Sequence, residues 1–198
     1  MNVHVITDVA TRGETAFVAL LDAAAPARPA FFQVRERSLT DRELLRFVSA
    51  ARQALPAQTR VLVSGRPDVA VAGGAEGVQL PSTGLPAKDV RRFFPSPFLI
   101  GVSCHSWDDV KRAADDGADF ALLAPIYPPT SKPLDRAPLG PETLDGALPP
   151  LLLHVLGGIT AERVASWPLA RRSNVAAVAG IGAFQGDPRG AIEALRLL

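Results

Sequence analysis

Two stretches, VAGGAEGVQL (71–80) and AADDGADFALL (113–123), decide the fold because they repeat one pattern. Each ends a helix-like segment on glycine, adds alanine and an acidic residue, and then begins a short apolar run. ARRSNVAAVAG (170–180) repeats the same order with Ser173 and Asn174 in place of Gly-Ala. The spacing of the repeats is irregular, so they indicate recurring helix-to-strand units rather than a solenoid.

Working outward from these units, we find eight apolar runs that predict strands, at 3–7, 30–34, 60–63, 76–80, 98–102, 119–124, 151–156 and 175–179. Amphipathic segments lie between them, and two begin with capping patterns, Thr40 with Glu43 and Ser106 with Asp109. Strands that alternate with helices pair in parallel through right-handed crossovers. Eight such units predict a compact, single-domain (β/α)8 TIM barrel over residues 1–198, with short helices. A doubly wound open sheet is the alternative, but no G-x-G-x-x-G follows the first strand.

The composition of the chain excludes some classes of function. The chain has 198 residues, of which 47% are hydrophobic, and this profile is typical of a soluble globular protein. A formal charge of +1 without a basic stripe predicts no nucleic-acid partner, and no apolar run is long enough for a membrane helix. Cys104 is the only cysteine, so we expect a reducing compartment and a cytoplasmic protein. Exposed apolar positions on short helices favour a homodimer.

Glycine turns after the last two strands indicate where a ligand binds. In a barrel the site lies at the C-terminal strand ends, and the loops after strands seven and eight often hold a phosphate. Gly157 and Gly158 follow the seventh strand, and Ala179 and Gly180 end the eighth. Glycines let backbone amides approach an anion, and a helix that begins near Thr160 would add its positive end. A plain tight turn is the alternative for Gly157-Gly158.

The stretch LLAPIYPPTSKPLD (122–135) adds a third candidate wall. An apolar strand ends there, and four prolines forbid its continuation as strand or helix. The loop carries Thr130, Ser131 and Lys132. It is either a rigid surface connection with a solvated lysine, or one side of a site for a small anion.

The chain resembles the thiamine phosphate synthase and thiazole tautomerase superfamily nearly end to end. The resemblance rests on seven stretches in order: VHVITD, FQVRERSLTDRELL, EGVQLPSTGLP, IGVSCHSWDDVKRAADDGADF, APIYPPTSKP, LGGIT and VAAVAGIGAF. Members of this superfamily are (β/α)8 barrels, so the resemblance implies the same fold. It also implies a thiamine-pathway protein whose small-molecule ligand is a thiazole phosphate.

The resemblance implies two sets of site residues. Contacts with a pyrimidine pyrophosphate are implied for Gln33, Arg35, Arg37, Ser64 and Ser103. Contacts with the thiazole and its phosphate are implied for Thr130, Ser131, Lys132, Gly157, Gly158, Ala179 and Gly180. Glu36, between the two arginines, is expected to neutralise them at the surface.

The chain departs from the family where a metal would bind. The family holds Mg²⁺ with carboxylates after the third and fourth strands, but this chain has Ser64-Gly65 and Gly84 at those positions. Asp68 is near in sequence but falls at a helix start, where capping is its expected role. We therefore expect no metal site and no cofactor, with Mg²⁺ required only if the synthase reaction is retained.

Missing carboxylates beside an intact phosphate end favour a metal-independent thiazole tautomerase, an isomerase that shifts a proton. The family's histidine for that step is replaced by Ala124-Pro125, so His105 is the candidate acid or base, and Lys132 is the second catalytic candidate. His4, His154 and Cys104 are expected to be structural. The alternatives are a Mg-dependent thiamine phosphate synthase, a transferase, and a non-catalytic or regulatory phosphate-binding relative.

Overall fold

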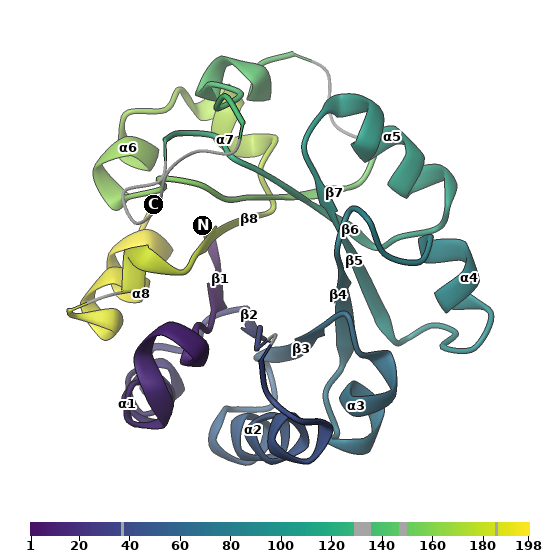
Figure 1. The fold of residues 1–198 in the computed structure, drawn as a ribbon. Coiled ribbons are helices and arrows are strands. Elements are labelled where there is room, and N and C mark those ends of the chain that lie inside the picture. The colour runs from purple at the N-terminus through teal and green to yellow at the C-terminus, as the bar shows by residue number, and fades with distance from the viewer. Residues whose placement is uncertain (37, 129–135, 147–149, 185) are drawn as a thin grey trace.

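A computed structural model describes residues 1–36, 38–128, 136–146, 150–184 and 186–198. Eight parallel strands close into a barrel in the order β1 to β8, with β1 paired to β8, and helices surround it (Figure 1). The predicted (β/α)8 TIM barrel is confirmed. Each predicted strand is present, with ends shifted by two residues at most.

The strands are β1 Asn2–Ile6, β2 Phe31–Val34, β3 Arg60–Ser64, β4 Gly77–Leu80, β5 Leu99–Cys104, β6 Phe120–Leu123, β7 Leu152–Val155 and β8 Ala177–Gly180. The α-helices are α1 Val9–Ala27, α2 Asp41–Ala54, α3 Pro67–Ala72, α4 Ala87–Arg91, α5 Trp107–Asp115, α6 Ala161–Ala165, α7 Leu169–Ser173 and α8 Pro188–Arg196. Two 3₁₀ helices complete the described elements, η1 Pro141–Leu144 and η2 Gly182–Phe184.

The helices are mostly short, as the chain length requires. In the described part of the connection between β6 and β7, the 3₁₀ helix η1 stands where an α-helix was expected, and the seventh unit has two short helices, α6 and α7. The predicted capping box at α2 is confirmed, because Thr40 Oγ1 accepts the Glu43 amide while Glu43 accepts the Thr40 amide. Ser106 caps α5, but the Asp109 carboxylate accepts the His105 amide instead.

The strand residues alternate between two environments, as the period of two requires. One set, which includes Val3, Val5, Phe32 and Val34, packs under the helices in the main apolar core. The other set points into the barrel. There Phe31 of β2 lies 5.8 Å from Phe120 of β6, ring centroid to centroid, a contact that only the barrel interior permits.

The barrel interior is more polar than the usual branched aliphatic layers. His4 and His154 are 0% and 1% exposed, and their Nδ1 atoms lie 3.0 Å apart. The His154 ring stacks on Phe120 at 4.3 Å, and Phe31 packs against both histidines. Both histidines are core residues, as expected; their Nδ1 atoms pair across the interior, while His4 Nε2 has no hydrogen-bond partner among the described residues.

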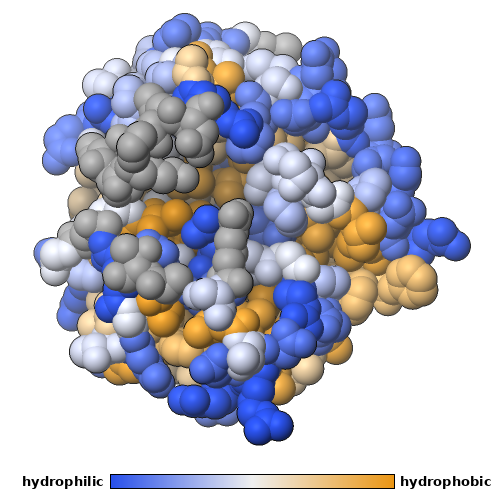
Figure 2. All heavy atoms as spheres, viewed as in Figure 1, coloured by the Kyte–Doolittle hydropathy of each residue, from blue (hydrophilic) through white to orange (hydrophobic). Residues whose placement is uncertain are grey.

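Figure 2 shows hydrophilic residues along much of the periphery and hydrophobic residues nearer the centre of the same face. Among the described residues, no helix combines the length and apolarity needed to cross a membrane.

Candidate functional site

The candidate residues gather at one rim because parallel strands all end at the same edge of the barrel. The turns after β7 and β8 are neighbours there, since β7 pairs with β8. Gly157, Gly158, Ala179 and Gly180 therefore lie on adjoining strand ends, opposite the ends of β2 to β5. This rim, called the mouth below, holds every candidate residue that the structure describes.

The glycine turn after β7 packs tightly against the chain after β6. Gly157 and Gly158 have φ of +104° and +59°, a region that side chains disfavour. A Cβ on Gly157 would lie 2.7 Å from Pro125 Cβ, and one on Gly158 would lie 2.6 Å from the Pro128 carbonyl oxygen. The Tyr127 amide also donates to the Gly157 carbonyl at 3.0 Å. The described part of the proline-rich loop thus forms a wall beside this turn.

Thr130, Ser131 and Lys132 lie outside the described residues, as does Arg37. The expectation that Thr130, Ser131 and Lys132 close over an anion therefore stays a prediction.

Arg163 fixes this turn, and the sequence reasoning missed it. Its guanidinium donates to the Gly158 carbonyl and lies 4.5 Å from the centre of the Tyr127 ring, a cation–π contact. Trp167 Nε1 donates to the Tyr127 hydroxyl at 2.7 Å. The expected helix start is correct, because Thr160 caps α6 by accepting the Arg163 amide.

Two amide–hydroxyl pairs line the β2–β5 half of the mouth. Gln33 Nε2 of β2 donates to Ser64 Oγ of β3 at 2.7 Å. Gln79 Nε2 of β4 donates to Ser103 Oγ of β5 at 3.1 Å. Gln33 and Gln79 are each 2% exposed, and the Oε1 atom of each has no hydrogen-bond partner among the described residues. Gln79 was missed because it was read only as part of a buried strand.

The other half of the mouth is apolar. Ile6, Leu122 and Ala179 form a small buried cluster, against which Leu156 and Ile181 pack. These residues come from the ends of β1, β6, β7 and β8. The mouth is therefore divided into a polar half on β2–β5 and an apolar half beside the glycine turns.

Glu36 corrects one expectation. It is 6% exposed rather than at the surface, and its Oε1 accepts from Thr7 Oγ1 at 2.5 Å and from the Val9 amide at 2.8 Å. Thr7 Oγ1 in turn accepts the Arg35 amide at 3.0 Å. Glu36 thus connects the ends of β1 and β2 and satisfies an amide of the first turn of α1.

His105 lies at the end of β5, facing the end of β6. Its Nδ1 is 2.7 Å from the Ala124 carbonyl oxygen. Because that oxygen can only accept, Nδ1 carries the hydrogen, and in the neutral ring the lone pair is on Nε2. The expectation that His105 precedes the α5 cap is correct. Its Nε2 is the nitrogen available for proton transfer.

Cys104 precedes His105 in the chain, and its side chain lies on the opposite face of β5, under the helices. It is 0% exposed and packs in the outer core. Burial is the main cause that raises the pKa of the thiol to about 12. It is a small buried hydrophobe, as expected, and not a nucleophile.

The residues after β3 and β4 do not fit a carboxylate-bound Mg²⁺. Ser64-Gly65 ends β3, and the described residues contain no group of three or more His, Cys, Asp or Glu side chains that could hold a metal. Asp68 is in the first turn of α3 but is held mainly by Arg66, whose Nε and Nη2 donate to it at 2.9 and 2.7 Å. This pairing is the main cause that lowers the pKa of Asp68, and hydrogen bonds from the backbone amides of Val69 and Asp68 at the helix start lower it further.

Comparison with known proteins agrees with this architecture. The family described as "Thiamine monophosphate synthase" matches residues 3–184. A "Putative thiamine-phosphate synthase" of Geobacter sulfurreducens is 35% identical over 94% of this chain and 88% of that protein. A "Thiamine-phosphate synthase" of Methanoculleus marisnigri is 35% identical over 98% of this chain and 93% of that protein.

Solved structures show the same fold. Thiamine phosphate pyrophosphorylase from Pyrococcus furiosus aligns with a TM-score of 0.79 and 24% identity, over 99% of this chain and 94% of that one. Phosphoribosyl anthranilate isomerase from Thermotoga maritima aligns with a TM-score of 0.59 and 18% identity, over 98% and 97%. With the family match over most of the chain, these findings lead to one conclusion: the chain belongs to the thiamine monophosphate synthase family.

Proposed function

We propose that the protein is a transferase that joins hydroxymethylpyrimidine pyrophosphate to thiazole phosphate, giving thiamine phosphate and pyrophosphate. The bond between the pyrimidine methylene carbon and the diphosphate oxygen breaks, and its electron pair leaves with pyrophosphate. The thiazole ring nitrogen then supplies the electron pair of the new C–N bond. This proposal replaces the tautomerase as the first choice, because relatives that match nearly the whole chain are named as synthases.

The polar half of the mouth carries the proposal. Gln33 and Gln79 are each 2% exposed and hold the partly buried hydroxyls of Ser64 and Ser103, which are the polar groups of this half that a ligand can contact. Ser64 and Ser103 each accept an amide hydrogen, which leaves their own O–H groups to donate. An aminopyrimidine brings an amino donor and ring-nitrogen acceptors, the complement of this set.

The apolar half supports a second substrate. Leu156 and Ile181, which are partly buried and pack on the buried apolar cluster, offer a surface for a thiazole ring, and the turn at Gly157-Gly158 lies beside them. Two substrates on facing halves of one mouth suit a reaction that joins them. We propose that Arg35, Arg37 and Lys132 neutralise the leaving diphosphate, since guanidinium and ammonium groups bind phosphate oxygens.

Incubation with both substrates, followed by chromatography for thiamine phosphate, tests this function. Product formed by the wild type supports it, and its absence at saturating substrates rejects it. Parallel assays with Mg²⁺ and with a chelator measure whether the reaction still requires the metal, although the family's carboxylates after β3 and β4 are missing. A Ser103→Ala variant should raise the KM for the pyrimidine substrate about tenfold, equivalent to about 1.4 kcal/mol, and leave the KM for thiazole phosphate unchanged.

The second candidate is the metal-independent thiazole tautomerase, favoured by the lone pair on His105 Nε2 at the mouth. Proton exchange and aromatisation of a carboxylated thiazole phosphate would be followed by NMR. His105→Gln should abolish that turnover, and an unchanged rate would remove His105 as the base. Binding of thiazole phosphate without turnover in either assay would favour a non-catalytic relative.

We also propose a cytoplasmic location and a homodimeric state for this protein. Leu85 and Phe93, which flank α4, are 67% and 77% exposed and support association of two copies. Light scattering during size-exclusion chromatography tests this, and a monomer mass would reject the dimer.

A further inference from the structure

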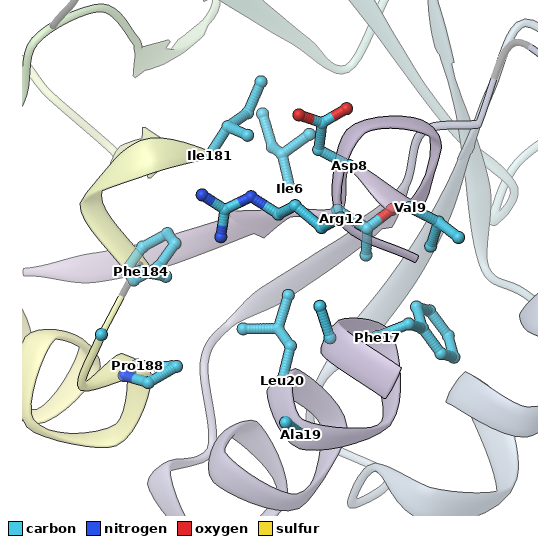
Figure 3. A pocket seen from close by; sticks show the side chains of 13 residues that line it. Ile6, Asp8, Val9, Arg12, Phe17, Ala19, Leu20, Ile181, Phe184 and Pro188 are labelled. Carbon is cyan, nitrogen blue, oxygen red and sulfur yellow. The ribbon is translucent and has the colours of Figure 1, made fainter. Parts of the chain in front are cut away.

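A pocket of about 220 Å³ opens between the first turns of α1, the end of β8 and the start of α8 (Figure 3). It lies at the same rim as the mouth. Its lining includes four apolar and two charged side chains, Ile6, Leu20, Ile181, Phe184, Asp8 and Arg12.

The backbone of α1 places Arg12 across this pocket. Gly13 has φ of +79° and ψ of 170°, a non-helical conformation that separates the first turn from the rest of the helix. Figure 3 shows the Arg12 side chain extending toward Ile181 and Phe184, while the Asp8 carboxylate extends to a different side. Within the described residues, the Arg12 guanidinium has no hydrogen bond or ion pair, although most surface arginines of this barrel contact a carboxylate or carbonyl.

The pocket adjoins the apolar half of the mouth. Ile6 and Ile181 line the pocket and also belong to, or pack against, the cluster at the ends of β1 and β8. Ile181 directly follows Gly180, the last residue of β8. A ring on the apolar half therefore lies within reach of a group bound in the pocket.

We infer that Arg12 is a phosphate-binding residue of this site, which receives a phosphate monoester carried by a small, largely apolar ring. The inference rests on the proposed function, in which that ligand is thiazole phosphate. A planar guanidinium can donate hydrogen bonds to two phosphate oxygens at once. The N–H donors of Arg12 make no hydrogen bond within the described residues, so they are available for such a ligand. The apolar lining from Ile6, Ile181 and Phe184 suits the ring and linker next to the anion.

Calorimetry with two ligands tests the role of Arg12. Thiazole phosphate and the same thiazole without its phosphate would be titrated into wild type, Arg12→Gln and Arg12→Lys. Arg12→Gln should raise the Kd for thiazole phosphate ten- to a hundredfold and leave the Kd for the unphosphorylated thiazole unchanged, and Arg12→Lys should fall between. Arg12 is exposed, so the variants should unfold at the wild-type temperature.

A matched control separates Arg12 from a general charge effect. Arg60→Gln removes one exposed cation from the start of β3, at the opposite rim from the mouth, and should leave both Kd values unchanged. If Arg12→Gln behaves like Arg60→Gln while wild type binds thiazole phosphate, the inference is wrong and the proposed function stands. If wild type does not bind thiazole phosphate at all, both are wrong.

Discussion

Mild acid should destabilise this barrel through the two histidines in its interior. Burial lowers the pKa of His4 to about 3 from 6.5, and it also lowers the pKa of His154 well below 6.5, with the neighbouring His4 as a second cause. Both rings stay neutral in the folded chain, whereas the unfolded chain takes up protons below pH 6.5. Their contribution to stability is therefore complete above pH 6.5 and is lost as the pH falls toward the folded-state pKa.

The size of the effect follows from this difference. Between pH 7 and pH 5.5, proton uptake by one unfolded imidazole with a pKa of 6.5 stabilises the unfolded chain by about 1 kcal/mol. Proton uptake by His4 and His154 in the unfolded chain should together lower the free energy of unfolding by about 2 to 3 kcal/mol. This is a large share of a typical stability of about 5–15 kcal/mol. Asp41 and Asp68 contribute little in this window, because their pKa values are lowered from 3.8 and lie below it.

Urea unfolding at pH 7, 6.5, 6 and 5.5 measures this loss. The chain has only three histidines, so His105→Gln is the matched control: it retains both interior histidines and should keep the loss assigned to them. Proton NMR of the imidazole signals adds a second measurement, in which His4 and His154 should not titrate between pH 7 and 5.5. A stability that changes by less than about 0.5 kcal/mol, or two titrating interior imidazoles, would refute the reasoning.

Three other predictions concern packing and reactivity. Gly101→Ala should lower the unfolding free energy by about 1–3 kcal/mol in urea titrations, because its Cβ would lie 2.1 Å from the Phe120 ring. Glu36→Ala should cost about 2 kcal/mol or more, since it leaves Thr7 and a helix amide without their buried acceptor; wild-type stability would contradict this. Cys104 should resist a thiol reagent at pH 8 in the native protein and react rapidly in urea, and equal rates would show that the thiol is accessible.

Local signals in the sequence were enough to predict the strands and the fold. Apolar runs such as 60–63 and 98–102 lie between glycine, proline and capping residues, so each element could be placed from its own neighbourhood. The Thr40–Glu43 capping box was predicted correctly for the same reason, because both partners lie within one helical turn. The position of the mouth followed from topology, since parallel strands end at one edge.

Contacts between distant segments could not be predicted in this way. His4 and His154 each read as an isolated core residue, and their pairing depends on the register of β1, β8 and β7. Glu36 looked like a surface carboxylate because its partner Thr7 lies on another strand. Arg12 does not belong to any sequence motif that we recognised. The direction of its side chain depends on the non-helical conformation of Gly13, which residue spacing does not show.

The closure of the barrel between its first and last strands brings the two ends of the described chain together. The Met1 amino group donates to the Arg196 carbonyl at 3.3 Å, and Arg196 reaches back to the Ala27 carbonyl. A short peptide linker could span this gap, and the backbone could then be opened at a surface turn between any helix and the strand that follows it. Such a circular permutant would keep all eight strand pairings, so the arrangement of the mouth does not depend on where the polypeptide starts.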